Sequence, residues 1–275
     1  MVKMIKRPVL RYHGGKWRLA PWIIDHFPNH QIYVEPFGGA ASVLMRKARS
    51  RLEVINDLND RIVSAFRVLR NPEEAMRLAK LLTLTPYANS EYVACRERST
   101  DPVEDARRLI VLAYQGHGST GASGGKLTGW RRGDRGSQST SARDWASLPD
   151  HVTAWSERLR DVFIESTEAL KVIRRYDGPE TLFYVDPPYL PSTRCRGLKG
   201  YAHEMTTKEH QELAETLHKV EGYVVLSGYA SDLYTHLYPD WRRVEQNVVA
   251  DKAKSTTEVL WLSPRIYHTE LPLFR

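Results

Sequence analysis

The chain has 275 residues, of which 41% are hydrophobic and 27% charged, a composition typical of a folded globular protein. Its formal charge of +7 suits a polyanionic partner, although many basic proteins bind no nucleic acid. No segment approaches the roughly 20 apolar residues of a membrane-spanning helix, and the first residues lack the apolar core of a signal peptide. Cys95 and Cys195 are too few and too far apart for a disulfide framework or a zinc site, so we expect free thiols, no metal and a cytoplasmic protein.

The first recognisable elements alternate between strand and helix patterns. Residues 32–34 form a short apolar run typical of a buried strand, followed by the turn-rich residues 35–39 and by apolar residues at helical spacing over 40–48. A second strand pattern covers 52–55 and ends in the polar run 56–60. This order opens a doubly wound nucleotide-binding unit, although other α/β proteins begin in the same way.

The alternation stops in the middle of the chain. Residues 61–82 and 102–114 have amphipathic helical patterns, and 115–145 is rich in Gly, Ser, Thr and Arg without regular spacing. An irregular stretch of this length inside a compact protein is usually functional or disordered. Its basic residues are Lys126, Arg131, Arg132, Arg135 and Arg143, against the acidic Asp134 and Asp144. We interpret 63–162 as an inserted, mainly helical subdomain within an α/β domain formed by 1–62 and 163–275.

Strand patterns resume after the predicted insertion. Residues 181–185 form a β-rich apolar run that stops at Asp186-Pro187-Pro188-Tyr189. Thr206 and Glu209 have the spacing of a capping box, which predicts that a helix begins there. Apolar runs at 223–227 and 258–262 predict two further buried strands, so the sequence as a whole indicates an α/β fold.

The Asp186-Pro187-Pro188-Tyr189 segment follows a buried strand, at the end where open α/β sheets place their ligands. Two prolines stiffen this loop and leave its carbonyls free as hydrogen-bond acceptors. Asp186 and the Pro187 carbonyl can together accept both hydrogens of an exocyclic amino group, while Tyr189 stacks on the flat base that carries it. A proline turn that ends a strand without further function is the alternative.

Three features further upstream favour a nucleoside-like ligand. Tyr12 and Lys16 flank a glycine pair that allows a ligand to approach the backbone closely. Residues 35–42 lack the spaced glycines of a pyrophosphate cradle and the Gly-Lys-Ser/Thr end of a P-loop. Asp57, at the end of the next strand, is placed to bind ribose hydroxyls. A flexible turn beside a surface lysine is the alternative for the first feature, and a solvated helix cap for the last.

In this order, the motifs at 12–16, 34–43, 56–59 and 183–189, with the C-terminal part through Leu262, resemble the adenine-specific (N6) DNA methyltransferase family that includes the bacterial Dam enzymes. The resemblance implies a Rossmann-like methyltransferase sheet, S-adenosylmethionine as methyl donor and S-adenosylhomocysteine as product. It implies donor-binding roles for Tyr12, Lys16, Glu35, Phe37, Gly38, Asp57 and Asp186. Tyr12 stands where some relatives have Trp, and Ala41 where glycine is frequent, which requires only a tolerant backbone angle.

The resemblance also implies methyl transfer to the N6 amino group of adenine in double-stranded DNA, with the base flipped out of the duplex. Asp186, Pro187 and Tyr189 are the candidate catalytic residues, and placement of the reactants supplies most of the rate. We expect the insertion to recognise the DNA target, with a mobile solvated loop as the alternative. The candidate DNA-binding residues are Lys126, Arg131, Arg132, Arg135, Arg194, Arg196 and Lys199.

Two other classes of function stay open from the sequence. One is a methyltransferase that acts on RNA or on a protein amide, because related proline-aromatic motifs serve those amino groups. The other is a nucleic-acid-binding module that keeps the fold without catalysis. His13, His117 and His203 have no recognisable carboxylate partner in the sequence, so we do not assign them as general bases. We expect a monomer or weak dimer in a bacterial or phage-infected cell, without a membrane partner.

Overall fold

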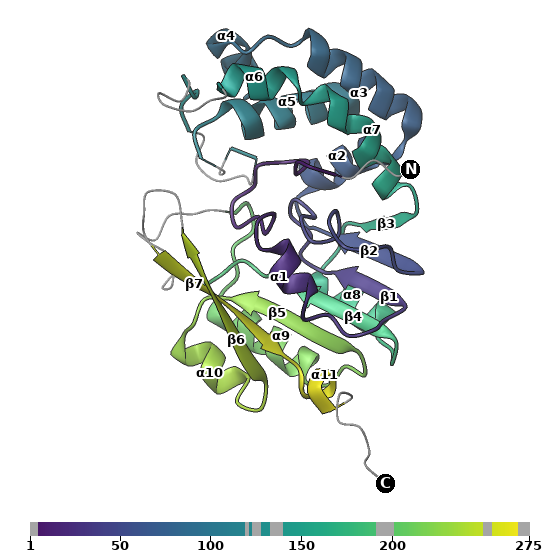
Figure 1. The fold of residues 1–275 in the computed structure, drawn as a ribbon, viewed down its shortest axis with the longest axis vertical. Helices are drawn as coiled ribbons and strands as arrows, with labels where there is room; N and C mark the ends of the chain where they lie inside the picture. The colour runs from purple at the N-terminus through teal and green to yellow at the C-terminus, as the bar shows by residue number, and fades with distance from the viewer. Residues whose placement is uncertain are drawn as a thin grey trace.

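The computed structural model describes residues 5–118, 121–122, 128–132, 140–190, 201–249 and 255–268. Figure 1 shows a sheet in the lower part of the molecule and a group of helices above it. The strands are β1 Ile32–Glu35, β2 Leu52–Asn56, β3 Val162–Glu165, β4 Thr181–Val185, β5 Tyr223–Gly228, β6 Arg242–Val249 and β7 Ser255–Leu262. The helices are α1 Ala20–Ile24, α2 Asp60–Arg70, α3 Pro72–Leu84, α4 Asn89–Ala94, α5 Pro102–Gln115, α6 Ser141–Ala146, α7 Val152–Leu159, α8 Ala169–Tyr176, α9 Thr207–Leu217, α10 Asp232–Leu237 and α11 Pro264–His268, with a 3₁₀ turn at Pro149–His151.

The seven-stranded sheet has the order β3-β2-β1-β4-β5-β7-β6. Neighbours from β3 to β5 are parallel, whereas β7 runs antiparallel to both β5 and β6. Parallel strands are usually covered on both faces, and every residue of β4 is buried. The sheet confirms the predicted α/β class and is consistent with the S-adenosylmethionine-dependent methyltransferase fold that the resemblance implies.

The apolar runs predicted as strands lie in β1, β2, β4, β5 and β7. Two further strands, β3 and β6, were not predicted, and both lie at an edge of the sheet. β3 has four residues and exposes Phe163, while β6 is mostly polar. Because an edge strand is paired on one side only and tolerates polar side chains, neither strand shows the apolar run that identifies a central one. The capping box of Thr206 and Glu209 is confirmed at the start of α9.

The segment 40–48 is a series of turns and not the helix that its apolar spacing predicts. Ala41 has a φ of +50°, in the left-handed region that interrupts a right-handed helix. The N–H of Leu44 donates to the Glu35 carboxylate over 2.7 Å instead of to the carbonyl four residues earlier. The Leu44 carbonyl accepts a hydrogen bond of 2.6 Å from Arg158 Nη2. Side chains from β1 and α7 therefore replace the helical hydrogen bonds of Leu44, whereas the N–H groups of Met45 and Lys47 still donate to the carbonyls four residues earlier, over 2.9 Å each.

Helices α2 to α7 lie between β2 and β3 in the chain, in the region predicted as an insertion. The stretch 61–82 is divided at Asn71, which ends α2 and caps α3 by accepting hydrogen bonds from two N–H groups of its first turn. One cluster of buried side chains includes both Tyr33 of the sheet and Leu109 of α5. The helical group therefore shares a hydrophobic core with the α/β part, and the limits 63–162 stay a prediction.

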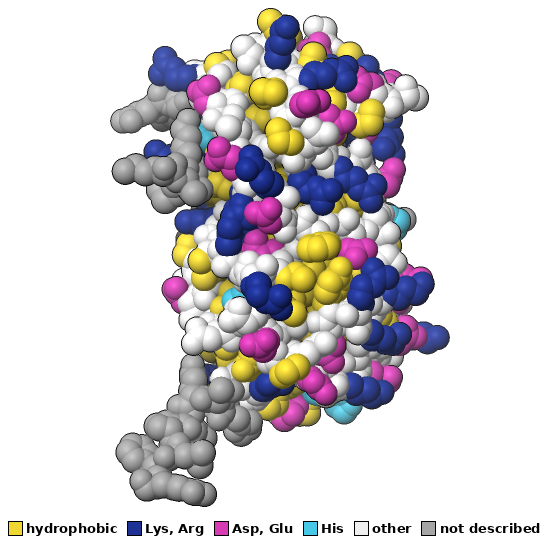
Figure 2. Space-filling view, turned by 90° about the vertical axis from the view of Figure 1, so that its right-hand side faces the viewer, with side chains coloured by type: hydrophobic (Ala, Val, Ile, Leu, Met, Phe, Trp, Pro, Cys, Tyr) yellow, Lys and Arg dark blue, Asp and Glu magenta, His cyan; other side chains and the backbone are white. Residues whose placement is uncertain are grey.

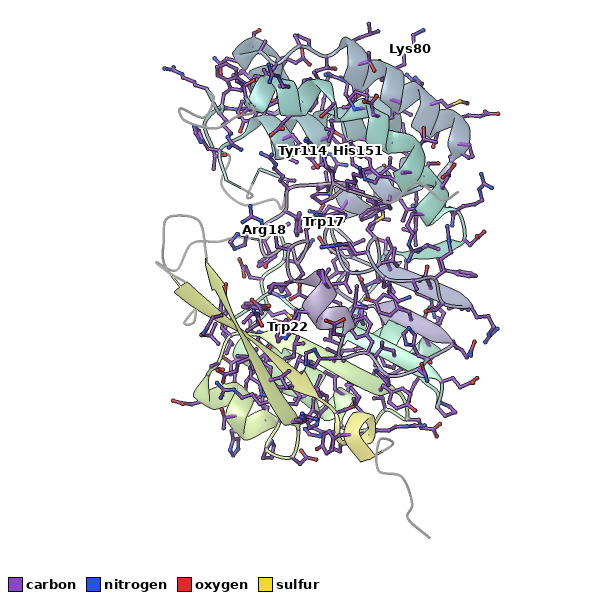
Figure 3. All side chains as sticks on the ribbon, in the orientation of Figure 1. Trp17, Arg18, Trp22, Lys80, Tyr114 and His151 are labelled. Atoms are coloured by element: carbon purple, nitrogen blue, oxygen red, sulfur yellow. The ribbon has the colours of Figure 1, made fainter. Side chains whose placement is uncertain are left out.

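The N-terminal segment passes between the helical group and the sheet (Figure 1). The indole N–H of Trp155 donates to the Arg7 carbonyl over 3.0 Å, and the Tyr114 hydroxyl donates to the Pro8 carbonyl. Figure 3 shows Tyr114 above this segment and Trp17 below it. These two hydrogen bonds fix the N-terminal segment to the helical group.

Charge is mixed over the face shown in Figure 2, where Lys and Arg side chains alternate with Asp and Glu. No helix among the described residues is long and apolar enough to cross a membrane. Within the same ranges, no group of three or more His, Cys, Asp or Glu side chains could hold a metal ion. Cys95 is a buried free thiol, and Cys195 lies outside the described residues.

Candidate active site

A cavity of about 560 Å³ opens at the carboxyl ends of β1, β2 and β4. This is the edge at which open α/β sheets bind their ligands. Its wall includes residues 12–16, most of the turn 35–43, residues 56–59, Asp186 and Pro188, together with 168–170 and 201–205. The structure therefore brings together the motifs that the sequence singled out, and adds two segments that it did not.

Backbone hydrogen bonds fix the turn after β1 to the end of β2. The N–H of Gly38 donates to the Asn56 carbonyl over 2.7 Å. Asp57 accepts hydrogen bonds of 2.8 Å from the N–H groups of Gly39 and Asn59, one at each carboxylate oxygen. Burial raises the pKa of the Asp57 carboxyl, and these donors oppose that shift. Each Asp57 oxygen keeps acceptor capacity for a further donor, such as a ligand hydroxyl.

Glu35 ends β1 and is a buried carboxylic acid in the cavity wall. Its Oε1 accepts two hydrogen bonds of 2.7 Å, from the Tyr33 hydroxyl and from the Leu44 N–H. Burial raises the pKa of Glu35 to about 7 in spite of these donors. Near neutral pH the carboxyl therefore takes or releases a proton readily, and it can face either a donor or an acceptor group of a ligand.

Two glycines allow aromatic rings to lie against the backbone beside the cavity. A Cβ on Gly39, which has a φ of +48°, would lie 3.1 Å from the ring of Tyr12. A Cβ on Gly14, with a φ of +71°, would lie 2.2 Å from the Tyr201 hydroxyl. The Tyr201 ring also meets the His13 ring edge-on, at 5.2 Å between centroids. The segment that begins at Tyr201 thus closes over the N-terminal part of the cavity wall.

Asp186 is held by donors from two distant segments. Lys16 Nζ donates to its two carboxylate oxygens over 2.9 and 3.0 Å, and to the Gly14 carbonyl over 2.8 Å. Ser227 of β5 donates to Asp186 Oδ1 over 2.7 Å. Lys16 is 4% exposed, and burial alone would lower its pKa, but the carboxylates of Asp186 and Glu258 raise it above the ordinary value. Lys16 is therefore a fixed cation next to Asp186.

Tyr189 lies outside the cavity wall and is buried. Its hydroxyl donates to Glu258 of β7, and its ring meets that of Tyr229 edge-on, at 4.7 Å between centroids. Lys16 Nζ lies 4.7 Å from the centre of the same ring. The Pro187 side chain is also buried. Stacking of a base on Tyr189 stays a prediction.

Two of the predicted DNA-binding residues lie in the described part of the chain. Arg132 is exposed, and Arg131 is half-buried. The Arg131 N–H donates to the Gln115 carbonyl over 2.8 Å, and its carbonyl accepts a bond of 2.7 Å from the Tyr87 hydroxyl. These bonds fix the backbone at Arg131 to the end of α5 and to Tyr87. The other candidates, Lys126, Arg135, Arg194, Arg196 and Lys199, lie outside the described residues.

Sequence reasoning missed Ser227, Glu258 and Tyr201 as site residues. Ser227 and Glu258 are polar residues inside runs predicted as buried strands, a signal that could have identified both. Tyr201 has no comparable signal, because its contact with Gly14 joins distant parts of the chain. Of the histidines left unassigned, His13 and His203 are in the cavity wall.

The residues of the wall fit S-adenosylmethionine, a nucleoside with a positively charged sulfonium and no phosphate. The acidic side chains of the wall are Glu35, Asp57, Glu168, Asp186, Glu204, Glu209 and Glu212. Among the described residues of the wall, Lys16 is the one Lys or Arg, and it is paired with Asp186. An acidic wall of this kind favours a cationic ligand and disfavours a phosphate chain.

The sequence matches the family described as D12 class N6 adenine-specific DNA methyltransferase over residues 12–256. The chain is 26% identical over 239 residues to the DNA adenine methylase of Escherichia coli strain K12, covering 84% of each protein. It is 25% identical over 270 residues to the type II methyltransferase M1.LlaDCHI of Lactococcus lactis subsp. cremoris, covering 87% of each. It is 25% identical over 228 residues to the DNA adenine methylase of Haemophilus influenzae, covering 80% of this chain and 77% of that protein.

Proposed function

The chain belongs to the D12 class N6 adenine-specific DNA methyltransferase family, and we propose that it takes the methyl group from S-adenosylmethionine. Membership of this family makes the protein an enzyme that methylates adenine in DNA. The methyl donor binds in the cavity at the carboxyl ends of β1, β2 and β4. The acceptor is the N6 amino group of an adenine that leaves the DNA duplex and enters the site beside Asp186. Moving a base out of the stack costs a few kcal/mol, which contacts with the flipped base and the DNA backbone offset.

The hydrogen bonding of Asp186 is the observation that carries this proposal. A carboxylate has about four acceptor positions, two on each oxygen. Lys16 occupies one position on each oxygen, and Ser227 occupies a second position on Oδ1. The remaining position is on Oδ2, in a side chain that lines the cavity. Asp186 therefore has room for one more donor, as an adenine amino group requires.

Transfer begins when Asp186 Oδ2 accepts one amino hydrogen and the Pro187 carbonyl accepts the other. Adenine N6 is a weak nucleophile because its lone pair is delocalised into the ring, and the two acceptors favour the pyramidal nitrogen that frees the pair. When bound, S-adenosylmethionine supplies a methyl carbon whose bond to sulfur breaks as the bond to nitrogen forms, with the electron pair kept by sulfur. Asp186 Oδ2 holds the amino group in line during this step, and the nitrogen then loses a proton to solvent. Such placement is worth about 7–11 kcal/mol in favourable cases.

The cavity wall supplies the contacts for the donor. Tyr12 and Phe37 provide aromatic surface, and the turn that contains Gly38 holds the amino-acid end beside Glu35. The Asp57 carboxylate accepts hydrogen bonds from the ribose hydroxyls. Lys16 orients Asp186 between the donor and the target.

The helical region 63–162 is the part that we propose to recognise DNA. Arg132 is exposed next to Arg131, whose backbone is anchored by the Tyr87 hydroxyl, and these are the two proposed DNA contacts among the described residues. The other proposed contacts are Lys126, Arg135, Arg194, Arg196 and Lys199. The dependence of DNA affinity on salt concentration measures how many DNA phosphates the basic residues of the enzyme neutralise.

Transfer of a labelled methyl group from S-adenosylmethionine tests the proposal. The purified enzyme is given duplex DNA, RNA or a protein mixture, and the Asp186→Ala variant is assayed beside Asp240→Ala, which changes an exposed acid outside both the cavity wall and the region 63–162. Label in DNA with the parent and Asp240→Ala, and its loss with Asp186→Ala, supports the proposal. Label chiefly in RNA or protein would contradict the substrate, and an Asp186→Ala variant as fast as the parent would contradict the site.

A further inference from the structure

Glu258 is a buried carboxylate of β7 that makes two contacts with the active site. It is 5% exposed, its Oε1 accepts the hydroxyl hydrogen of Tyr189, and the same oxygen lies 3.6 Å from Lys16 Nζ. The register of β5 with β7 pairs Ser227 with Leu260, so Glu258, two positions before Leu260, lies on the same face of the sheet as Ser227. The two strands thus each place a polar side chain at the Asp186 loop.

Lys16 is shared between two carboxylates. Its ammonium donates to Asp186 over 2.9 Å and lies 3.6 Å from Glu258, while it also lies 4.7 Å from the centre of the Tyr189 ring. A cation over an aromatic ring is attracted to it, more strongly when both are buried. These contacts therefore connect four side chains in one network: Asp186, Lys16, Tyr189 and Glu258. Glu258 is the residue that β7 contributes to it.

The fold alone gives little reason for an acid at this position. A buried carboxylate loses its hydration, and an apolar side chain in its place is often equally or more stabilising. The neighbouring residues Val259, Leu260 and Trp261 are apolar and buried, as expected of a strand inside the core. Burial also raises the pKa of Glu258, while Lys16 and Tyr189 oppose that shift. Its contacts are directed at catalytic candidates, which points to a role in the reaction.

We propose that Glu258 is a positioning residue for methyl transfer. It fixes the phenol of Tyr189 through a hydrogen bond, and its carboxylate attracts the Lys16 ammonium that also pairs with Asp186. Fixing the phenol sets the orientation of the Tyr189 ring, on which the target base is predicted to stack. Because Lys16 is attracted to both carboxylates, it does not fully neutralise the negative charge of Asp186. The Asp186 Oδ2 atom therefore stays a strong acceptor for the amino group. This inference rests on the proposed function, because it assigns Glu258 to the same reaction.

Three variants separate the two contacts. Glu258→Gln keeps an oxygen that accepts the Tyr189 hydroxyl but removes the charge near Lys16. Glu258→Ala removes both, and Tyr189→Phe removes the hydroxyl alone. Glu245→Gln on β6 is the matched control, since this glutamate is half-exposed, is paired with Arg243 and lies opposite Val259 in the sheet. The double variant Tyr189→Phe/Glu258→Ala tests whether the two side chains act together.

Single-turnover methylation of duplex DNA, donor affinity and thermal unfolding are measured for each protein. We expect Glu258→Ala to slow the methylation step about tenfold or more, and Glu258→Gln to recover part of that rate. Donor affinity should change by less than about threefold, and Glu245→Gln should match the parent. The double variant should be no slower than Glu258→Ala, because the shared contact is lost once.

The fluorescence of 2-aminopurine at the position of the methylated adenine gives a second readout, since it reports how the flipped base is held. We expect an altered signal with Glu258→Ala and a parental signal with Glu245→Gln. A Glu258→Ala variant with the parental rate would overturn the inference, as would a loss of rate matched by an equal loss of donor binding. If the parent itself transferred no methyl group to DNA, the proposed function would fail first, so the two failures are distinguishable.

Discussion

Lys16 Nζ lies 2.9 Å and 3.0 Å from the two carboxylate oxygens of Asp186, although 170 positions separate these residues in the chain. The ion pair joins the N-terminal segment of the cavity wall to the loop that follows β4. Removing one partner of a buried ion pair typically costs about 3–5 kcal/mol, because the other charge is left without compensation. Because a variant of either residue can lose activity through unfolding alone, its activity has to be compared at equal amounts of folded protein.

The stability of the enzyme should depend on pH through Glu35. Burial raises the pKa of this carboxyl from 4.5 to about 7, so the folded protein binds a proton that the unfolded chain releases. The stabilising contribution of Glu35 is complete below pH 4.5 and is lost as the pH rises through 7, by about 3 kcal/mol in total. Urea denaturation of the parent and Glu35→Gln from pH 4.5 to 8 measures this.

We expect the free energy of unfolding of the parent, relative to Glu35→Gln, to fall by up to that amount over this range. Glu215→Gln, on the exposed face of α9, controls for the loss of one carboxylate. A difference between parent and Glu35→Gln that is constant from pH 4.5 to 8 would show that the Glu35 proton is not linked to folding.

Ala41→Gly should be more stable than Ala40→Gly by about 1–2 kcal/mol. Both variants lose a buried methyl group and add entropy to the unfolded chain, but only Ala41 has a φ of +50°, which is costly for a residue with a Cβ and free for glycine. Ala40→Gly, at the neighbouring buried position without a positive φ, should destabilise by about 0.5–1 kcal/mol. Denaturation midpoints of the two variants compare them, and equal shifts would contradict the assigned strain.

Gly14→Ala should weaken donor binding about tenfold, because the new Cβ would lie 2.2 Å from the Tyr201 hydroxyl and in a strained backbone conformation. The segment 201–205 must then move away from the cavity. Adding Tyr201→Phe removes the clashing hydroxyl and should restore part of the affinity. Gly129→Ala, where a Cβ meets nothing within 4 Å, is the control. Calorimetric titration with S-adenosylmethionine measures the affinities, and parental binding by Gly14→Ala would show that Tyr201 does not close the cavity.

Arg158→Met should destabilise the fold by about 3–5 kcal/mol. Arg158 of α7 donates to Glu53 over 2.9 Å and to the Leu44 carbonyl over 2.6 Å, and Lys47 is the other partner of Glu53, at 2.7 Å. The variant leaves a buried carboxylate with one cation and a carbonyl without its donor. Chemical denaturation should place Arg160→Met, exposed at the end of the same helix, within about 0.5 kcal/mol of the parent. Equal stabilities of the two variants would refute the structural role.

The motifs and the central strands were predictable because each is written in a continuous stretch of sequence. The apolar runs of β1, β2 and β4 end at residues that line one cavity, and the family predicted from these motifs is confirmed by the match over 12–256. The edge strands β3 and β6 were not predictable in this way, since their polar residues give no apolar period.

Long-range contacts explain the remaining differences. The helix predicted over 40–48 is absent because Ala41 adopts a left-handed angle, and because side chains distant in sequence bond the Leu44 backbone. In the same way, Glu258 and Ser227 join the site only through strand pairing and the fold of the β4 loop. A pattern in neighbouring residues does not predict contacts between distant segments. A polar residue inside an apolar run that is predicted to be buried is nevertheless a usable signal of such a contact.

Chemical identification of the methylated base tests most directly whether this enzyme methylates adenine N6 through Asp186. DNA from cells that express the parent or the Asp186→Ala variant is digested to nucleosides, and the modified nucleosides are separated and identified by mass spectrometry. We expect N6-methyladenine with the parent and none above background with Asp186→Ala, at equal amounts of folded protein. Methylated cytosine in place of N6-methyladenine, or equal N6-methyladenine from both proteins, would contradict it.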